Sequence, residues 1–314
     1  MTAGQGTSLI HRALVYSGER EFLAAAVPFL RAGLTADDVV LVAASPPRLD
    51  RVRRALGAAA EPVLFLDVAE WYRHPVRTIA AYDQFLRAQA PRRVRALAEL
   101  DWADRRRREA REWARYEAVV NEVFGTSGAR ALCAYDRHAT APGMLAEVRR
   151  THRELVEDGR PRSSADYTDP GRLFAEFDRE PLPLPPPPVF DSLPIESDDL
   201  HEVRAFVAAR AARHGLPGRA LSALLVAVTE LAANAVKHGT PPMAVRLWAD
   251  GPDLVCEVAD CGLWRPDALL GFVPPAAATS GGFGLWGVRM LADAVQVRAG
   301  WDGTVVRLRM RLTG

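Results

Sequence analysis

Two oxygen-bearing side chains interrupt an otherwise apolar segment, TELAANAVKHG, at residues 229–239. Glu230 and Asn234 stand four residues apart, so on a helix of about 100° per residue they share one face. Ala223 and Ala227 are expected to leave space beside them on that face. The opposite stripe is apolar and is expected to pack on a sheet: Leu221, Leu224, Leu225, Val228 and Leu231. A carboxylate can accept a proton and an amide oxygen can bind a hard cation, so this face is either a ligand-pocket wall or ordinary solvent-exposed surface.

Further residues suited to an anion site follow in the chain. Asp260 ends a predicted strand in VADCGLW, two residues before Gly262. A glycine-rich segment that runs into a helix presents free backbone N–H groups to an anion. TSGGFGLWGVRMLAD places three glycines directly before a predicted helix: Gly281, Gly282 and Gly284. Thr304 then lies on a closing strand. Each feature alone has a simpler explanation, such as a turn-forming role for Asp260, but their order indicates a single site.

The chain contains a second pair with the same spacing, Glu117 and Asn121 in YEAVVNEVF. Nothing that follows this pair resembles a phosphate site, so the spacing alone does not define one. We interpret the second pair as surface residues or as partners in local hydrogen bonding.

Composition argues against several classes of protein. The 314 residues are 49% hydrophobic and 25% charged, which is typical of globular proteins, and the length suits two domains. A net charge of +1 disfavours direct nucleic-acid binding, and no apolar run reaches the roughly 18 residues of a membrane span. The N-terminus has no signal-peptide pattern, so a cytoplasmic protein without membrane association is expected. Cys133, Cys256 and Cys261 lack C-x-x-C spacing, which argues for a reducing compartment and against a zinc site.

A proline-rich run, PLPLPPPPVF at residues 181–190, divides the chain. We predict a first domain at 1–180, a linker at 181–194 and a second domain at 195–314. In the first domain, short apolar runs alternate with helical segments, which predicts an α/β fold with a mostly parallel sheet. A long amphipathic helix is expected at 101–124. The predicted strands are 11–16, 38–44, 62–67, 94–100 and 129–136.

The second domain is predicted to be an α+β two-layer sandwich, with helices over one face of a mixed sheet. The predicted helices are 201–215, 216–239 and 285–294. The predicted strands are 243–249, 253–260 and a closing pair across a W-D-G turn. Lys237, the only lysine of the chain, lies close to Glu230 around the second of these helices.

The ordered motifs of residues 195–314 resemble the GHKL ATP-binding superfamily. Within it, E-L-x-x-N-A and the H-G that follows are most similar to the bacterial anti-sigma-factor serine kinases. This resemblance implies ATP and Mg²⁺ as cofactors and a serine or threonine on a protein partner as the phosphate acceptor. It also implies a possible homodimer.

The resemblance assigns roles to the matching residues of this chain. Glu230 would be the general base that takes a proton from the acceptor hydroxyl, and Asn234 would coordinate Mg²⁺. Asp260 would accept a hydrogen bond from the adenine amino group, and Gly262 would let the purine lie close to the backbone. The other expected nucleotide-binding residues are Lys237, Gly282, Gly284, Leu285 and Thr304.

Two features depart from the family pattern. The second motif reads D-C-G-L-W, with Trp264 where the family often has a second glycine. The segment from there to Gly281 is short and contains Pro274 and Pro275. ATP binding therefore follows from the resemblance more directly than turnover does. A non-catalytic, ATP-dependent protein-binding switch stays open as an alternative.

Residues 8–160 resemble the MEDS sensory domain, an α/β module similar to the RecA/KaiC core. The resemblance is carried by HRALVYSGEREFLAAAVPFLRAGLTADDVVLV and YEAVVNEVF…ALCAYDRH. The first strand ends in YSGERE, where a RecA-like ATPase has its phosphate loop, but no lysine stands there. Sensing or partner binding is therefore expected rather than ATP hydrolysis. The candidate pocket residues, each with a purely structural role as the alternative, are His11, Glu19, Trp71, Cys133, Tyr135 and His138.

These observations predict a cytoplasmic regulator of transcription. Its second domain would bind a sigma factor and phosphorylate an anti-anti-sigma (STAS-type) partner, and its first domain would modulate that activity. A histidine kinase is a further alternative, because RTHREL around His152 superficially resembles a phosphoacceptor sequence. The loop-like EDGRPRSSADYTDPGR that follows argues against a helical dimerisation hairpin there.

Overall fold

The chain folds into two compact units, Met1–Leu173 and Phe174–Gly314, in a computed structural model. The division lies near the predicted end of the first domain at residue 180. Half of the predicted linker 181–194 and the start of the predicted helix 101–124 lie outside the described residues. Residues 191–194 of that linker form a strand of the second unit, so the linker prediction is wrong at its end. The structure describes residues 8–72, 74–99, 107–157, 159–179, 182–183, 190–196, 198, 200–264, 269, 271–273 and 284–312.

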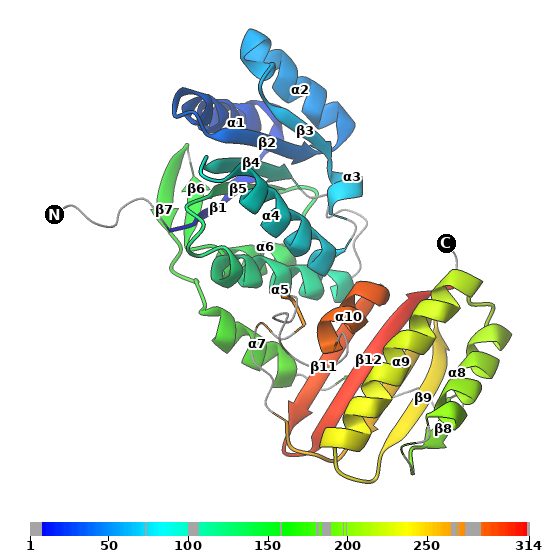
Figure 1. Cartoon of the computed structure of the whole chain (residues 1–314). Coiled ribbons are helices and arrows are strands. Elements are labelled where there is room, and N and C mark those ends of the chain that lie inside the picture. The colour runs from blue at the N-terminus through cyan, green and yellow to red at the C-terminus, as the bar shows by residue number, and fades with distance from the viewer. Residues whose placement is uncertain are drawn as a thin grey trace. The chain divides into compact units, whose positions relative to one another are not determined.

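The first unit holds a seven-stranded sheet in the order β3-β2-β4-β5-β1-β6-β7 (Figure 1). The strands are β1 Ile10–Tyr16, β2 Val39–Ala44, β3 Leu64–Asp67, β4 Val94–Glu99, β5 Arg130–Asp136, β6 Glu154–Glu157 and β7 Arg160–Ser163. Neighbouring strands are parallel except β6 and β7, which are antiparallel. The predicted α/β class and the five predicted strands are therefore confirmed. The prediction missed β6 and β7 because each is only four residues long and β7 is exposed.

Helices cover both faces of this sheet, with α1 and α2 on one face and α4, α5 and α6 on the other (Figure 1). The helices are α1 Gly18–Thr35, α2 Pro46–Leu56, η1 Gly57–Ala60, α3 Val68–Trp71, α4 Pro75–Gln89, α5 Arg107–Val123 and α6 Pro142–Thr151. Helix α7, Pro170–Arg179, spans the division between the units. Proline stands at the start of α2, α4 and α6, where its fixed φ suits a helix and its missing N–H costs nothing.

Strand alternation decides which side chains meet which helices. Leu14 of β1 and Leu132 of β5 are buried in the apolar core with Phe22 of α1. Because successive side chains point to opposite faces, His11 and Cys133 project toward the other helix layer. The face of the sheet toward α1 and α2 is therefore apolar. The opposite face, toward α5, carries the imidazole of His11 and the thiol of Cys133.

The second unit is built on a five-stranded sheet in the order β11-β12-β10-β9-β8. The strands are β8 Asp191–Pro194, β9 Ala244–Asp250, β10 Asp253–Asp260, β11 Ala294–Gly300 and β12 Gly303–Arg311. The helices are α8 His201–Arg213, α9 Gly218–His238 and α10 Gly284–Leu291. All pairings in this sheet are antiparallel, so the expectation of a mixed sheet is wrong. The α+β two-layer sandwich is confirmed, with α8 and α9 over one face of the sheet (Figure 1).

Helix α9 supplies much of the core of the second unit. Leu224, Val228 and Leu231 are buried, as predicted. Leu221 and Leu225 are only partly buried against that core. Ala227 is also buried in the core, so the expectation that it leaves space beside Glu230 is wrong. The buried face is broader than the predicted leucine stripe, because small alanines let the helix approach the sheet closely.

Of the described helices, only α9 is long and apolar enough, by length and composition, to cross a membrane. A core helix of a globular protein passes the same test, so this is weak support for a span. The helix also carries Glu230, Asn234 and Lys237 in its second half.

We expect Leu224→Ala to lower the free energy of unfolding of the second unit by about 2–5 kcal/mol, because it opens a cavity in a fully buried position. Val226→Ala on the same helix is the matched control. Its side chain is 50% exposed, so it should change the free energy of unfolding by less than about 1 kcal/mol. Urea unfolding followed by circular dichroism measures both variants. Equal costs for the two variants would contradict the assigned core face.

Candidate functional site

The carboxylate of Glu230 lies at the start of α10. Its Oε1 accepts a hydrogen bond from the backbone N–H of Gly284 at 3.1 Å, and both residues are partly buried. Gly284 begins α10 with φ of +56°, a conformation that favours glycine. A carboxylate at a helix N-terminus is stabilised by the free N–H groups there. Gly284 is thus the first residue of the helix predicted to follow the glycines, and the anion-binding role of this segment stays a prediction.

Asn234 and Lys237 follow Glu230 along α9. Asn234 is partly buried, and its side chain makes no hydrogen bond within the described part of the chain. Lys237 is exposed in the last turn of α9 and forms no ion pair with any described residue. The Asn234 amide and the Lys237 ammonium group can therefore contact a ligand beside the C-terminal half of α9, the part of the helix that also carries Glu230.

Asp260 organises the loop that follows β10. Its Oδ1 accepts hydrogen bonds from the backbone N–H of Gly262 at 2.6 Å and of Thr240 at 3.4 Å. The bond to Gly262 is the local turn that an Asp at this position can form by itself. Within the described residues Oδ2 accepts no hydrogen bond, so one oxygen of the carboxylate stays available. Asp260 therefore combines the turn-forming role with a free acceptor.

Glycines let three backbone segments meet at Asp260. A Cβ on Gly262 would lie 2.8 Å from Asp260 Oδ1, and a Cβ on Gly239 would lie 2.7 Å from Asp260 Cγ. Gly239 caps α9 and Gly303 begins β12, with the Gly303 backbone against the Asp260 carbonyl oxygen. Only glycine fits at these approaches, because any side chain would displace the carboxylate or its backbone.

Thr304 closes this cluster from β12. It pairs with Asp260 across the sheet, is 8% exposed, and donates from Oγ1 to the carbonyl oxygen of Gly262 at 3.3 Å. The structure therefore brings Asp260, Gly262 and Thr304 together, as the sequence predicted. The signal was sufficient here because all three lie at or beside the ends of two adjacent strands.

The remaining predicted residues are placed differently. Leu285 is buried in the core of the unit, so its side chain packs against the sheet layer. Trp264 is partly buried and packs against the same core. Gly281 and Gly282 lie outside the described residues.

In the first unit, three of the six candidate pocket residues converge on Glu117. They are His11, Cys133 and Tyr135. Glu117 is 1% exposed, so the interpretation of the Glu117–Asn121 pair as a surface feature is wrong. The other interpretation of this pair, local hydrogen bonding, is confirmed, because Asn121 Nδ2 donates to the Glu117 carbonyl oxygen at 3.3 Å.

The other three candidates lie elsewhere. Trp71 packs edge-on against Tyr82. Glu19 is exposed and pairs with Arg51 at 3.0 Å, and His138 is exposed. These placements are those of packing and surface residues.

His152 is fully buried, at 0% exposed. A phosphoacceptor histidine must be accessible to the γ-phosphate of ATP, so the buried position of His152 does not support the histidine-kinase alternative built on it. Burial lowers the pKa of His152 well below its ordinary value, so its imidazole is neutral.

The YSGERE segment, residues 16–21, runs from the last residue of β1 into the first turn of α1. The backbone N–H of Ser17 donates to Glu21 Oε2 at 2.7 Å, which places a carboxylate where a phosphate loop would bind an anion. Beside it, Tyr16 donates to Glu99, and Arg48 donates to Glu99 Oε2 at 2.7 Å. Burial raises the pKa of the Tyr16 phenol. Glu99 was not singled out from the sequence, because its partners Tyr16 and Arg48 come from β1 and α2.

Two family models match the chain. Residues 10–153 match MEDS, the methanogen/methylotroph, DcmR sensory domain, and residues 193–310 match the histidine kinase-like ATPase domain. The chain therefore holds a MEDS domain and, after it, a histidine kinase-like ATPase domain, whose two-layer fold is that of the GHKL sandwich. The second match supports an ATP-binding regulatory role and a kinase-like activity.

Similarities to solved structures are weaker. The RsbU and RsbW domains of Rv1364c from Mycobacterium tuberculosis share 22% identity at a TM-score of 0.31, over 40% of this chain and 33% of that one. The mycobacterial sensor histidine kinase MprB shares 21% identity at a TM-score of 0.27, over 39% of this chain and 97% of that one. The chain thus spans about a third of the first structure, and scores this low carry no argument about function. No curated protein matches the chain.

We expect Gly303→Ala to lower the free energy of unfolding by about 1–3 kcal/mol, because φ is +106° and the new methyl group would collide with the Asp260 carbonyl oxygen. Gly251→Ala is the matched control. Gly251 has a φ of +63°, and an added methyl group there would meet no other atom. The substitution should therefore lower the free energy of unfolding by only about 1 kcal/mol, the cost of a left-handed backbone conformation. Thermal unfolding compares the two variants. A smaller effect at Gly303 than at Gly251 would contradict the tight approach to Asp260.

Proposed function

We propose that the second unit binds ATP with Mg²⁺ and transfers a phosphoryl group to a serine or threonine of an anti-anti-sigma protein, and that it also binds a sigma factor. The observation that carries this proposal is the hydrogen bond from Gly284 N–H to Glu230, which sets a carboxylate of α9 against the N-terminus of α10. The match to the histidine kinase-like ATPase domain supports the ATP-binding part.

The adenine side would be held by the Asp260 cluster. Asp260 Oδ2 accepts no hydrogen bond from the described residues and could accept one from the exocyclic amino group of a purine. Gly262 lets its backbone lie against Asp260 and Gly239, and Thr304 donates to its carbonyl oxygen, so the backbone beside the Asp260 acceptor is held in place. Asp260, Gly262 and Thr304 fit a nucleobase, because their hydrogen bonds to one another hold the Asp260 carboxylate in one orientation before a ligand binds.

The metal and phosphate side would be held by the second half of α9. The Asn234 amide oxygen is a suitable ligand for Mg²⁺, a hard cation that prefers oxygen. Lys237, which forms no ion pair with any described residue, lies three residues further along the same helix and suits an anionic oxygen. Bound ATP with Mg²⁺ would supply the transferable γ-phosphoryl group.

Glu230 would act on the acceptor hydroxyl. Its Oε1 is fixed by Gly284 N–H, which orients the carboxylate and leaves Oε2 to take the proton of a serine or threonine. Phosphoryl transfer depends chiefly on positioning and charge stabilisation, so this orientation is the main contribution of the residue. The first unit would modulate the choice between partners in a cytoplasmic protein, for which the resemblance to the anti-sigma-factor kinases implies a homodimer.

A second candidate function follows from the same hydrogen bond. Glu230 holds the first residue of α10, a positioning role that needs no proton transfer. Trp264 packs into the core where a flexible glycine is usual. In this alternative, ATP fixes α10 and the segment before it so that a partner docks, and no phosphate is transferred.

We expect Asn234→Ala in the full chain to weaken Mg²⁺-dependent ATP binding by at least about tenfold, because it removes an oxygen ligand of the cation. Asn234 makes no hydrogen bond within the described residues, so the unfolding temperature should not change. Isothermal titration calorimetry with and without Mg²⁺ measures the effect. Glu202→Gln, an exposed charge change on α8, is the control and should bind ATP like the wild type.

Such a titration contradicts the proposed site in either of two cases. The first is wild-type protein that binds no ATP. The second is Asn234→Ala protein that binds ATP with unchanged dependence on Mg²⁺.

Two substitutions at Glu230 separate catalysis from positioning. Glu230→Gln keeps an acceptor for Gly284 N–H but cannot take a proton, whereas Glu230→Ala loses both. If Glu230 is the base, both variants bind ATP and both lose about 10²- to 10⁴-fold in transfer rate. Radiolabelled phosphate transfer to the acceptor protein measures this.

The alternative switch gives a different pattern. Glu230→Gln would then retain partner binding and Glu230→Ala would lose it, with no transfer in the wild type. Transfer by Glu230→Gln at the wild-type rate would show that the carboxylate only positions α10.

A further inference from the structure

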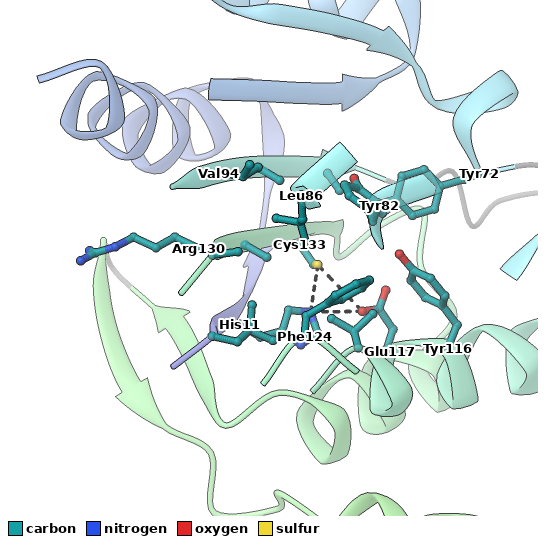
Figure 2. Close-up of a pocket in the computed structure, with 16 residues that line it drawn as sticks. His11, Tyr72, Tyr82, Leu86, Val94, Tyr116, Glu117, Phe124, Arg130 and Cys133 are labelled. Atoms are coloured by element: carbon teal, nitrogen blue, oxygen red, sulfur yellow. Dashed lines mark hydrogen bonds and ion pairs between the residues drawn. The ribbon is translucent and has the colours of Figure 1, made fainter. Parts of the chain in front are cut away.

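Four metal-ligating side chains converge in the interior of the first unit. They come from β1, α5, β5 and the residue after α6, and their donor atoms all lie within 4.8 Å of one another: His11, Glu117, Cys133 and His152. Figure 2 shows His11, Cys133 and Glu117 pointing toward one another from the two strands and from α5. The four residues are between 0% and 7% exposed.

Four of the six donor–donor separations are close to those that a tetrahedral metal ion would impose. His11 Nε2 lies 3.3 Å from Cys133 Sγ and 3.3 Å from Glu117 Oε2. Glu117 Oε2 lies 3.7 Å from His152 Nε2 and 3.9 Å from Cys133 Sγ. Metal–ligand bonds of about 2.0–2.3 Å at tetrahedral angles give ligand–ligand distances of about 3.3–3.8 Å. A small shift of each side chain would therefore complete the coordination.

The hydrogen bonds on the outer side of both imidazoles orient their free nitrogens inward. His152 Nδ1 contacts the Val148 carbonyl oxygen at 2.9 Å, and a carbonyl only accepts, so Nδ1 carries the proton. His11 Nδ1 contacts Asn121 Oδ1 at 3.1 Å. The Asn121 amide is oriented by its NH₂ group, which donates to the Thr151 carbonyl oxygen at 2.8 Å. Both Nε2 lone pairs thus face the cluster, the arrangement found around metal-bound histidines.

The carboxylate is oriented in the same manner. Tyr135 donates its phenolic O–H to Glu117 Oε1 at 3.1 Å. This leaves Oε2 as the oxygen nearest to the other three donor atoms. Every prospective ligand atom therefore points inward, and Asn121, Tyr135 and Val148 form the outer shell.

The charges call for a cation. Among the described residues, Glu117 has no ion pair with arginine or lysine, although a buried carboxylate is costly without one. His152 Nε2 is buried without a hydrogen-bond partner. A divalent ion with one thiolate, one carboxylate and two neutral imidazoles has net charge zero. It would satisfy the lone pair of His152 and compensate Glu117 at once.

We propose that His11, Glu117, Cys133 and His152 bind one divalent transition-metal ion, Zn²⁺ foremost, at a tetrahedral site inside the first unit. The ligand set decides the class of metal, because thiolate and imidazole suit Zn²⁺ and its neighbours, whereas Mg²⁺ and Ca²⁺ prefer oxygen alone. This metal site is distinct from the Mg²⁺ proposed at Asn234, which belongs to the second unit.

A cavity of about 50 Å³ adjoins the site (Figure 2). His11, Glu117 and Cys133 contribute to its wall, which also includes Tyr72, Tyr82 and Tyr116. Burial raises the pKa of Tyr72, of Tyr82 and of Tyr116, so these phenols stay neutral. The metal would thus form one wall of an apolar cavity with room for a few water molecules or a small ligand.

The test uses the full-length protein, stripped of metal with a chelator and titrated with Co²⁺. We expect one equivalent to bind per chain, with the intense near-ultraviolet absorption of a cobalt–thiolate bond and the visible bands of a tetrahedral ion. One equivalent of Zn²⁺ should displace it. Zinc binding measured by calorimetry should show the same stoichiometry and needs no ATP or partner.

The variants identify the ligands. Cys133→Ser should lose the cobalt–thiolate absorption, and Glu117→Gln and His152→Ala should weaken Zn²⁺ binding at least about tenfold. Asn121→Ala, which removes only an outer-shell partner, should weaken Zn²⁺ binding about 10- to 100-fold. Cys256→Ser replaces the other buried thiol, in the second unit, and should bind like the wild type.

Several results would overturn the proposal. They are a wild type that binds no stoichiometric metal, a cobalt–thiolate absorption that survives in Cys133→Ser, and its loss in Cys256→Ser. Circular dichroism checks that each variant folds. Should Cys133→Ser not fold, the milder Asn121→Ala decides, because unchanged zinc affinity in a folded Asn121→Ala protein contradicts the assigned tautomer and the site.

Discussion

The cost of placing a carboxylate inside the protein organises both units. Glu99 is compensated by Arg48 and Tyr16, and Glu257 is bound by Arg307 at 2.6 Å and by Arg246 at 2.9 Å. Glu117 is as deeply buried as Glu257 but is met only by imidazoles, a thiol and a phenol. Glu99 and Glu257 are each met by arginine, whereas no described arginine or lysine pairs with Glu117, and this difference favours an external cation there.

Regular apolar patterns made most of the fold predictable. Buried parallel strands read as short continuous apolar runs, and α9 read as a helix by its period, so both unit classes and the main elements are correct. The failures occur where burial is not periodic. Helix α5 packs aromatic and aliphatic groups around most of its circumference, with Trp113, Tyr116 and Val120 buried beside Glu117. Its polar pair therefore reads as surface from the sequence but lies in the core.

The two sites differ in how far the sequence reveals them. Asp260, Gly262 and Thr304 lie at or beside the facing ends of adjacent strands, so their motifs keep a recognisable order along the chain. The cluster around Glu117 draws on β1, α5, β5 and the residue after α6, and only the strand register and helix layer bring these together. Cysteine spacing argued against zinc because the site uses a single thiol. His11 and Cys133 were candidates separately, but nothing in the sequence joined them to His152.

Glu230 shows why geometry alone does not separate an enzyme from a switch. The two oxygens of its carboxylate have different surroundings. Oε1 accepts a hydrogen bond from the first residue of α10, and Oε2 accepts none from the described residues. The same side chain can therefore hold α10 through one oxygen and accept a proton on the other. Any event that draws the α10 N-terminus toward a phosphate also turns the carboxylate, because the two share one hydrogen bond. The same contact can thus couple nucleotide binding to the position of α10, whether or not a proton is transferred.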